Sequence, residues 1–185
     1  MVPNSVSILT LNVRAPNNRS TLFSWLNCIK ADIICPQETH STSADEFASW
    51  VRSESDNGNN LQCYSVVSSP GSAHSSGVAI LYKPLKLATS FTDDVGRFMI
   101  AQLLASSDSS PFQVVNVYGP NRRQPGEHFF SSILPQIDPA LHSILCGDFN
   151  TVLNPQLDRM GCNPSSYWAY NWPQSLSILT PNLNL

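Results

Sequence analysis

Polar side chains that suit phosphate and metal chemistry follow four apolar runs of the sequence. The four clusters are Asn12, Gln37-Glu38-Thr39-His40, Tyr118-Gly119-Pro120-Asn121 and Gly147-Asp148-Phe149-Asn150. Side chains just past the ends of strands lie where a rigid sheet holds a site in place. The spacing therefore predicts one site, built from four chain segments at the rim of a sheet structure.

These clusters combine two carboxylates with several carboxamides and contain no cysteine. Such hard oxygen donors suit Mg²⁺, which keeps several waters and takes one or two carboxylates together with a substrate phosphate. Metal-assisted hydrolysis of a phosphoester also needs a group that orients the attacking water and donors for the phosphate oxygens. The residue types alone predict an oxygen-ligand metal site.

Each residue of these clusters also has a structural interpretation. Glu38 alone is typical of a solvated carboxylate at a strand end, and Tyr118 of a half-buried sheet aromatic. Asp148 and Asn150 form an Asx-type turn in the alternative interpretation, and Asn12 caps a turn or helix. The four histidines are scattered, and position singles out none of them as a catalytic base.

The elements that must position these clusters are short strands and three helices. Period-two and fully apolar runs predict strands, whereas apolar residues at helical spacing predict helices. Helices are expected over Arg19–Lys30, with Leu22, Trp25, Leu26 and Ile29 on one face, over Ala44–Glu54, and around Phe130, Ile133, Leu134 and Ile137. Strands are expected over Ser5–Asn12, Asp32–Pro36, Leu61–Ser68, Gly77–Lys83, Leu85–Thr92, Arg97–Leu104, Phe112–Tyr118 and Ser143–Gly147. This order predicts an α+β (α/β) sandwich of two packed mixed sheets flanked by helices.

Composition narrows the class of protein. The 185 residues are 42% hydrophobic and 12% charged, with a formal net charge of −3, so bulk charge does not indicate a nucleic-acid binder. No apolar run approaches the roughly 18 residues of a membrane span, and the N-terminus lacks the pattern of a signal peptide. We therefore expect an intracellular protein, cytoplasmic or nuclear and not secreted, with no membrane association.

Five scattered cysteines argue against a disulfide framework and against a zinc site.

Five motifs, in this order, resemble the endonuclease/exonuclease/phosphatase superfamily, whose members have a DNase I-like four-layer sandwich. They are Asn12, Gln37-Glu38-Thr39-His40, Ser76-Gly77-Val78-Ala79-Ile80-Leu81, Asn116-Val117-Tyr118-Gly119-Pro120-Asn121 and Gly147-Asp148-Phe149-Asn150. Within the superfamily, the second and fourth motifs and Leu157-Asp158-Arg159 are similar to the endonuclease domain of LINE-type non-LTR retrotransposons. The similarity spans Ser5 to about Arg159.

The resemblance implies a role for each matching residue. Glu38 corresponds to the acidic residue that binds the divalent metal, Mg²⁺ or alternatively Mn²⁺, with Asn12 beside it. Tyr118 corresponds to the tyrosine that contacts the scissile phosphate, Asp148 to the aspartate that orients or deprotonates the attacking water, and Asn150 to a carboxamide that holds the phosphate. Asn121, Arg14 and Arg159 are further candidates for substrate contacts. The implied reaction is a nick in DNA, with no small-molecule cofactor; the oligomeric state is left open.

The sequence departs from the family pattern in two ways. Pro36 precedes Gln37, and because proline removes a ladder donor, we expect this strand to be weakened or to end one residue early. The chain also contains no Ser-Asp-His tripeptide, no histidine after His142 and no charged residue after Arg159. We therefore expect an incomplete domain over 1–159, with the last strands missing, and a divergent tail over 160–185.

Two alternatives remain: another branch of the superfamily, such as an inositol-phosphate phosphatase or a secreted DNase, and a catalytically dead remnant that at most binds nucleic acid or protein.

Overall fold

The computed structural model describes residues 5–14, 19–55, 60–106, 109–120 and 123–151. The chain divides into two compact units. The first contains Met1–Tyr118 and Pro139–Asp148, and the second contains Gly119–Asp138 and Phe149–Leu185. Each unit is described by itself.

The first unit contains two four-stranded mixed sheets. The first sheet has the order β1-β2-β4-β3, formed by Ile8–Asn12, Ile33–Gln37, Val78–Tyr82 and Ser65–Ser69. β1 and β2 are parallel, and the other pairs are antiparallel. The second sheet has the order β5-β6-β7-β8, formed by Lys86–Thr92, Phe98–Leu104, Phe112–Tyr118 and His142–Asp148. Here only β7 and β8 are parallel.

The inner faces of the two sheets pack against each other. Because side chains alternate along a strand, every second residue of β2, β4, β6 and β7 points into the space between the sheets. This inter-sheet core is formed by Ile33, Cys35, Val78, Ile80, Tyr82, Leu85, Met99, Ala101, Leu103, Val114 and Tyr118. The predicted packing of two mixed sheets is confirmed.

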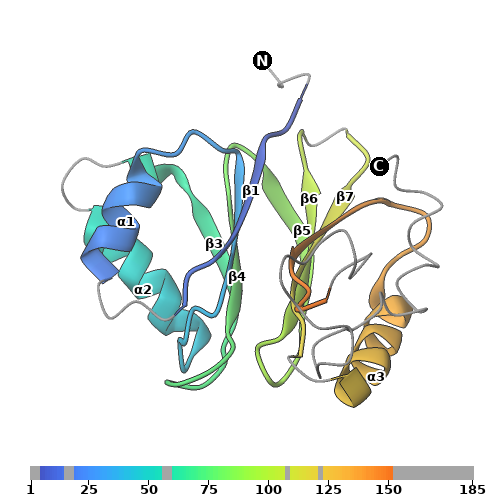
Figure 1. Ribbon diagram of the computed structural model, residues 1–185. Coiled ribbons are helices and arrows are strands. Elements are labelled where there is room, and N and C mark those ends of the chain that lie inside the picture. The colour runs from blue at the N-terminus through green and yellow to red at the C-terminus, as the bar shows by residue number, and fades with distance from the viewer. Residues whose placement is uncertain (1–4, 15–18, 56–59, 107–108, 121–122, 152–185) are drawn as a thin grey trace, which may run out of the picture. The chain divides into compact units, whose positions relative to one another are not determined.

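Two helices cover the outer face of the first sheet, α1 over Arg19–Asn27 and α2 over Ala44–Ser55 (Figure 1). Phe23 and Leu26 of α1 and Phe47 and Val51 of α2 pack on the outward residues of the sheet. α2 begins with a reciprocal cap, in which the Glu46 amide donates to Ser43 Oγ at 3.1 Å and the Glu46 carboxylate accepts from Thr42.

The second unit contributes one described helix, α3 over Arg123–Ile133, followed by a short 3-10 helix, η2, over Leu134–Gln136. Phe130 is buried and stacks on Phe149 with ring centroids 6.1 Å apart. Ile133 is buried as well. The predicted third helix is therefore present, and Phe130 and Ile133 are the two of its four predicted apolar residues that are buried.

The structure corrects two expectations about the first sheet and its helices. The run from Leu61 begins as a 3-10 helix, η1 over Asn60–Cys63, and the strand β3 starts only at Ser65. The helix α1 ends at Asn27, and its buried residues are Phe23 and Leu26. Trp25, which was expected on the buried face, is 46% exposed. None of the described helices is long and apolar enough to cross a lipid bilayer.

β2 does not end one residue early at Pro36, but its pairing with β4 is interrupted there. The strand runs through Pro36 to Gln37 and is buried at every position. Pro36 pairs in register with Leu11 of β1, whereas the pairing of β2 with β4 skips Cys35 and Pro36. Proline therefore interrupts only one of the two ladders, and the pairing with β1 continues to Gln37, the residue before Glu38.

Candidate functional site

One carboxamide joins two carboxylates that come from different sheets. Asn12 is the last residue of β1, and its Nδ2 donates to Glu38 Oε1 at 2.9 Å and to Asp148 Oδ2 at 2.8 Å. Its Oδ1 accepts a hydrogen bond from the backbone amide of Arg14 at 3.0 Å. Both donor hydrogens of Asn12 thus hold the strand ends together, and its acceptor fixes the turn that follows β1.

Glu38 is held in place by the backbone of the turn that follows β2. It has a φ of 53°, a left-handed conformation that is uncommon for residues other than glycine. The next two residues are anchored to the loop before β4, because the amide of Thr39 donates to Gly77 O and that of His40 to Ser76 O, both at 3.0 Å. These bonds fix a strained turn and so fix the direction of the Glu38 side chain.

The surroundings of Glu38 favour its ionised form. Burial raises the pKa of this carboxyl, but hydrogen bonds from Asn12 and Tyr118 and the electrostatic influence of His40 and Arg14 together bring the pKa below its usual value. A carboxylate that stays charged and accepts several hydrogen bonds is suited to hold a cation.

Tyr118 ends β7 and is 6% exposed. Its hydroxyl hydrogen bonds to Glu38, and burial, this hydrogen bond and the charge of Glu38 raise the pKa of Tyr118 to about 12. The guanidinium of Arg97 lies 5.0 Å from the centre of the ring. Tyr118 therefore stays protonated at neutral pH and acts as a hydrogen-bond donor.

Asp148 is the last residue of β8 and pairs in register with Tyr118. The residue before it, Gly147, has a φ of 134°, and a Cβ there would overlap the carbonyl oxygen of Val117. Because only glycine allows β8 to approach β7 this closely, Gly147 sets the position from which Asp148 reaches Asn12.

The site includes a histidine to which the sequence assigned no role. His40 Nε2 lies 3.7 Å from Glu38 Oε2, and this buried atom has no hydrogen-bond partner among the described residues. The sequence signal for it is its place in Gln37-Glu38-Thr39-His40. Arg14 is exposed, and its charge acts on Glu38.

A buried amide network lies directly beneath the site, and sequence reasoning gave no role to its members. Gln37 and Asn116 are 1% and 0% exposed. Gln37 Nε2 donates to Asn116 Oδ1 at 2.7 Å, and Asn116 Nδ2 donates to the carbonyls of Pro36 and Ala79 at 3.0 and 2.7 Å. The network ties the strand before Glu38 to the strand that carries Tyr118.

The structure thus brings together Asn12, Glu38, Tyr118 and Asp148, with Arg14 at their margin. Asn150 belongs to the second unit, where its Nδ2 donates to Gly119 O at 2.7 Å. Asn121 and Arg159, and the predicted tail 160–185, lie outside the described residues.

The donor set of the site suits a hard, hydrated divalent cation. The described residues contain no group of three or more His, Cys, Asp or Glu side chains that would enclose an ion by themselves. Mg²⁺ requires no such cage, since one or two carboxylates and several waters complete its shell. Glu38 offers the carboxylate, and the unpaired Nε2 of His40 beside it offers a polar partner for coordinated water. These residues fit Mg²⁺.

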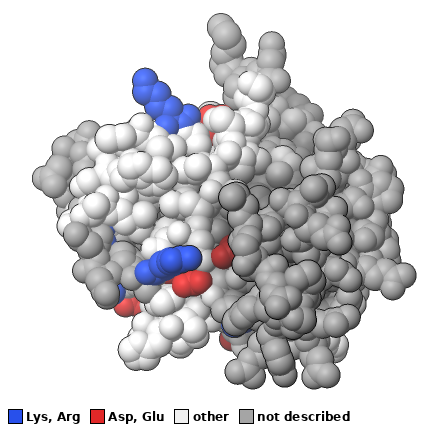
Figure 2. All heavy atoms as spheres, viewed as in Figure 1, with Lys and Arg blue, Asp and Glu red and all other residues white. Residues whose placement is uncertain are grey.

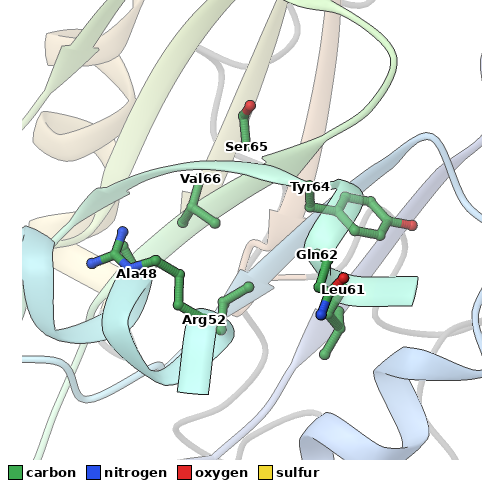
Figure 3. A pocket seen from close by; sticks show the side chains of 8 residues that line it. Ala48, Arg52, Leu61, Gln62, Tyr64, Ser65 and Val66 are labelled. Carbon is green, nitrogen blue, oxygen red and sulfur yellow. The ribbon is translucent and has the colours of Figure 1, made fainter. Parts of the chain in front are cut away.

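A pocket of about 600 Å³ lies elsewhere, between α2, η1 and β3 (Figure 3). None of its eight lining residues is an aspartate or glutamate, and it includes no residue of the site. The lining residues are Ala48, Val51, Arg52, Leu61, Gln62, Tyr64, Ser65 and Val66. Its chemistry does not match phosphoester hydrolysis, so the geometry at Glu38 and Asp148 identifies the candidate site instead.

Solved structures of several nucleases and phosphatases have a similar fold. An AP endonuclease from Archaeoglobus fulgidus matches 89% of this chain with 21% identity and a TM-score of 0.62. An AP endonuclease from Leishmania major matches 85% of the chain with 21% identity and a TM-score of 0.62. A 3′ phosphatase from Neisseria bound to product DNA hairpin matches 82% with 19% identity and a TM-score of 0.61. At these identities the likeness shows the fold.

The chain spans 65%, 59% and 63% of the lengths of these three proteins, respectively. The sequence pattern of the Endonuclease/Exonuclease/phosphatase family matches residues 9–179, which is most of the chain. This match includes all four clusters of polar residues and both sheets that position them. The chain belongs to the endonuclease/exonuclease/phosphatase family.

Proposed function

We propose that this chain hydrolyses phosphodiester bonds in DNA with the aid of Mg²⁺, as an endonuclease of the LINE-type retrotransposon kind. The observation that carries the proposal is the junction at Asn12, which holds Glu38 and Asp148 together at the ends of two sheets. Phosphodiester cleavage needs a cation site and a water-orienting carboxylate side by side, and this junction supplies both.

Each residue of the junction has a distinct part in the proposed reaction. Glu38 holds the metal ion, which when bound supplies positive charge to the phosphate oxygens. Asp148 accepts a hydrogen bond from the attacking water and orients it. Tyr118, whose single phenol proton is donated to Glu38 in the free chain, turns that proton toward the scissile phosphate when substrate binds. Asn12 keeps the two carboxylates in register, and His40 provides a polar group beside Glu38.

DNA is the proposed substrate on two grounds. The Neisseria protein of the same fold is described as bound to product DNA, and two others are AP endonucleases. The motifs Gln37-Glu38-Thr39-His40, Asn116–Asn121 and Leu157-Asp158-Arg159 favour the retrotransposon branch. We propose Arg14, Asn121, Asn150 and Arg159 as contacts to the phosphate backbone.

The surface charge predicts weak non-specific affinity for DNA. The described part of the face in Figure 2 is mostly uncharged, and a basic group there lies beside an acidic one. With ten Lys and Arg in the chain, few cations are available to displace counterions from DNA. Binding is therefore expected to depend on the site itself and on the metal ion.

A plasmid assay tests the proposal. We expect the full chain to convert supercoiled plasmid to the nicked form with Mg²⁺, and EDTA to abolish the reaction. Glu38→Gln and Asp148→Asn should each lower the rate by about 10²–10⁴, as for loss of a positioned acid–base or metal-binding group. Asp94→Asn, an exposed carboxylate distant from the site in the chain, serves as the matched control and should nick at the rate of the unchanged chain.

Two results would reject the proposal. Nicking that persists in EDTA, or that Glu38→Gln leaves unchanged, would assign the activity to a contaminant or to another site. A folded chain that shifts DNA in a gel but never nicks it would instead support the alternative of a binding protein without catalysis.

A further inference from the structure

Two cysteines from different sheets face each other in the core of the first unit. Cys35 lies in the middle of β2, is 0% exposed and points into the inter-sheet core. Cys146 lies on β8, is partly buried and packs against the same core. The thiol of Cys146 and burial together raise the pKa of the Cys35 thiol well above its usual value, as expected for two neighbouring buried thiols. Cys146 Sγ donates to Val115 O at 3.6 Å.

The strand register gives independent support for this placement. Cys35 and Gln37 are two residues apart in β2, so their side chains point to the same face. Cys146 pairs with Asn116 across β7 and β8, so these two side chains also share a face. Gln37 donates directly to Asn116 at 2.7 Å, so the neighbouring residues Cys35 and Cys146 face the same interface between the sheets.

The two sheets approach each other closely beside this pair. Asn116 reaches the main-chain carbonyls of Pro36 and Ala79 in the opposite sheet with one short side chain. A disulfide needs a similarly short separation, with Cα atoms about 4.4–6.8 Å apart. Of the other described cysteines, Cys28 and Cys63 are both exposed and neither belongs to this core.

We propose that Cys35 and Cys146 are a redox-modification site that closes to a disulfide between the two sheets when the chain meets a peroxide. The sulfur of Cys146, the more accessible of the two, attacks one oxygen of hydrogen peroxide, the O–O bond breaks, and a sulfenic acid and one water form. The sulfur of Cys35 then attacks the sulfenic sulfur, the S–O bond breaks, and the thiol proton leaves with the hydroxyl as a second water. Two thiols are oxidised and one peroxide is reduced.

The link would join the strands that carry the site. Cys35 precedes Glu38 by three residues, and Cys146 precedes Asp148 by two. Oxidation of the pair is measured on the two thiols themselves, so the test is independent of nuclease activity.

Peptide mapping tests the pair on the full chain. The reduced protein is treated with hydrogen peroxide at a one-to-one ratio, its remaining thiols are alkylated under denaturing conditions, and the digest is analysed by mass spectrometry. We expect one linked peptide that joins Cys35 to Cys146, loss of two titratable thiols, and full recovery of both after dithiothreitol. The melting temperature should be higher for the oxidised form than for the reduced form.

Cysteine variants supply the controls. A chain with Cys28→Ser, Cys63→Ser and Cys162→Ser keeps only the proposed pair and should still lose both thiols without forming disulfide-linked dimers. Cys35→Ser and Cys146→Ser, each folded by circular dichroism, should give no such link. The proposal is overturned if Cys35 remains fully alkylated after peroxide, if Cys146 accumulates as the sulfinic acid, or if either cysteine links to one of the other three instead.

Discussion

At the scale of single residues, the side chain of Asn116 donates the hydrogen bond that the backbone cannot donate at Pro36. Proline has no N–H, so at position 36 it cannot donate to the antiparallel strand β4. The flanking pairs Ile34↔Leu81 and Gln37↔Val78 put Ala79 opposite Pro36, and the Ala79 carbonyl instead accepts from Asn116 Nδ2 at 2.7 Å. A side chain from the second sheet therefore completes a ladder of the first, at the strand that presents Glu38.

Because Asn116 takes the place of a backbone donor at Pro36, changes at the two positions should be coupled in their effects on the free energy of unfolding. Asn116→Asp keeps the shape but loses both donated hydrogen bonds, so we expect the free energy of unfolding to fall by about 1–3 kcal/mol for each buried group left unpaired. Pro36→Ala restores an N–H at position 36. In that background, the cost of Asn116→Asp should be smaller by at least about 0.5 kcal/mol, as expected for residues that share a partner.

Urea unfolding of the two single variants and the double variant measures this coupling. Gln102→Ala, a half-buried amide on the neighbouring strand β6, is the matched control and should change stability by no more than about 0.5 kcal/mol. Strictly additive effects of the Asn116 and Pro36 changes would refute the shared-carbonyl explanation.

At the scale of elements, α2 owes its beginning to the cap at Ser43. Ser43 Oγ accepts from the amide of Glu46, and the Glu46 carboxylate accepts from the amide and hydroxyl of Thr42 at 2.6 and 2.8 Å. We expect Ser43→Ala to lower the free energy of unfolding by about 1 kcal/mol, because it leaves a helix-terminal N–H without its acceptor. Thermal or urea unfolding checks this.

A second serine of the same helix is the natural comparison. Ser49 Oγ donates to the Glu46 carbonyl from an exposed position in the helix interior, where alanine is the better helix former. Ser49→Ala should therefore be neutral or slightly stabilising. Equal destabilisation by the two changes would mean that the cap does not determine where α2 begins.

The sequence predicts the elements wherever a local pattern and the tertiary packing agree. Strand patterns such as Phe112–Tyr118 match the structure residue for residue. The pattern fails at Leu61, where long-range contacts decide: the amide of Asn60 donates to Asn27 Oδ1, and Asn60 Nδ2 donates to Ile29 O. These bonds to the end of α1 favour a 3-10 turn over the expected strand.

The same limit applies to the candidate site. The four clusters identify Asn12, Glu38, Tyr118 and Asp148, because polar residues at strand ends are visible in the sequence. Gln37 and Asn116 were not distinguished, since a buried polar residue within a strand shows its partners only when the two sheets are packed. Nor does any local pattern indicate that a proline is compensated by a side chain 80 residues away.

At the scale of the whole molecule, the first unit is closed by residues distant in the chain. Asn12 and Asp148, which share a hydrogen bond, are 136 positions apart. β8 joins β7 after the chain has passed through Gly119–Asp138 of the second unit. Because the two sheets share one core, we expect their unfolding to be a single transition, so that a change at either sheet is reported by the stability of both.

That cooperativity makes alkaline pH a test of two buried phenols at once. Burial, followed by the charges of Asp32 and Cys63, raises the pKa of Tyr64 to about 12, and burial with the hydrogen bond to Glu38 does the same for Tyr118. The Tyr64 hydroxyl donates to the Ala31 carbonyl, a bond that only the protonated phenol makes.

A group whose pKa is raised in the folded state contributes stability that is fully present below its unfolded pKa, about 10 for tyrosine. That contribution is lost as the pH rises toward about 12, the pKa of both groups in the folded chain. We therefore expect the free energy of unfolding to fall between about pH 10 and 12, and Tyr64→Phe and Tyr118→Phe each to make that fall less steep, with the double variant the least steep. Urea unfolding at fixed pH steps across this range measures the slopes, and slopes that neither phenylalanine changes would show that both phenols ionise in the folded chain as they do in the unfolded one.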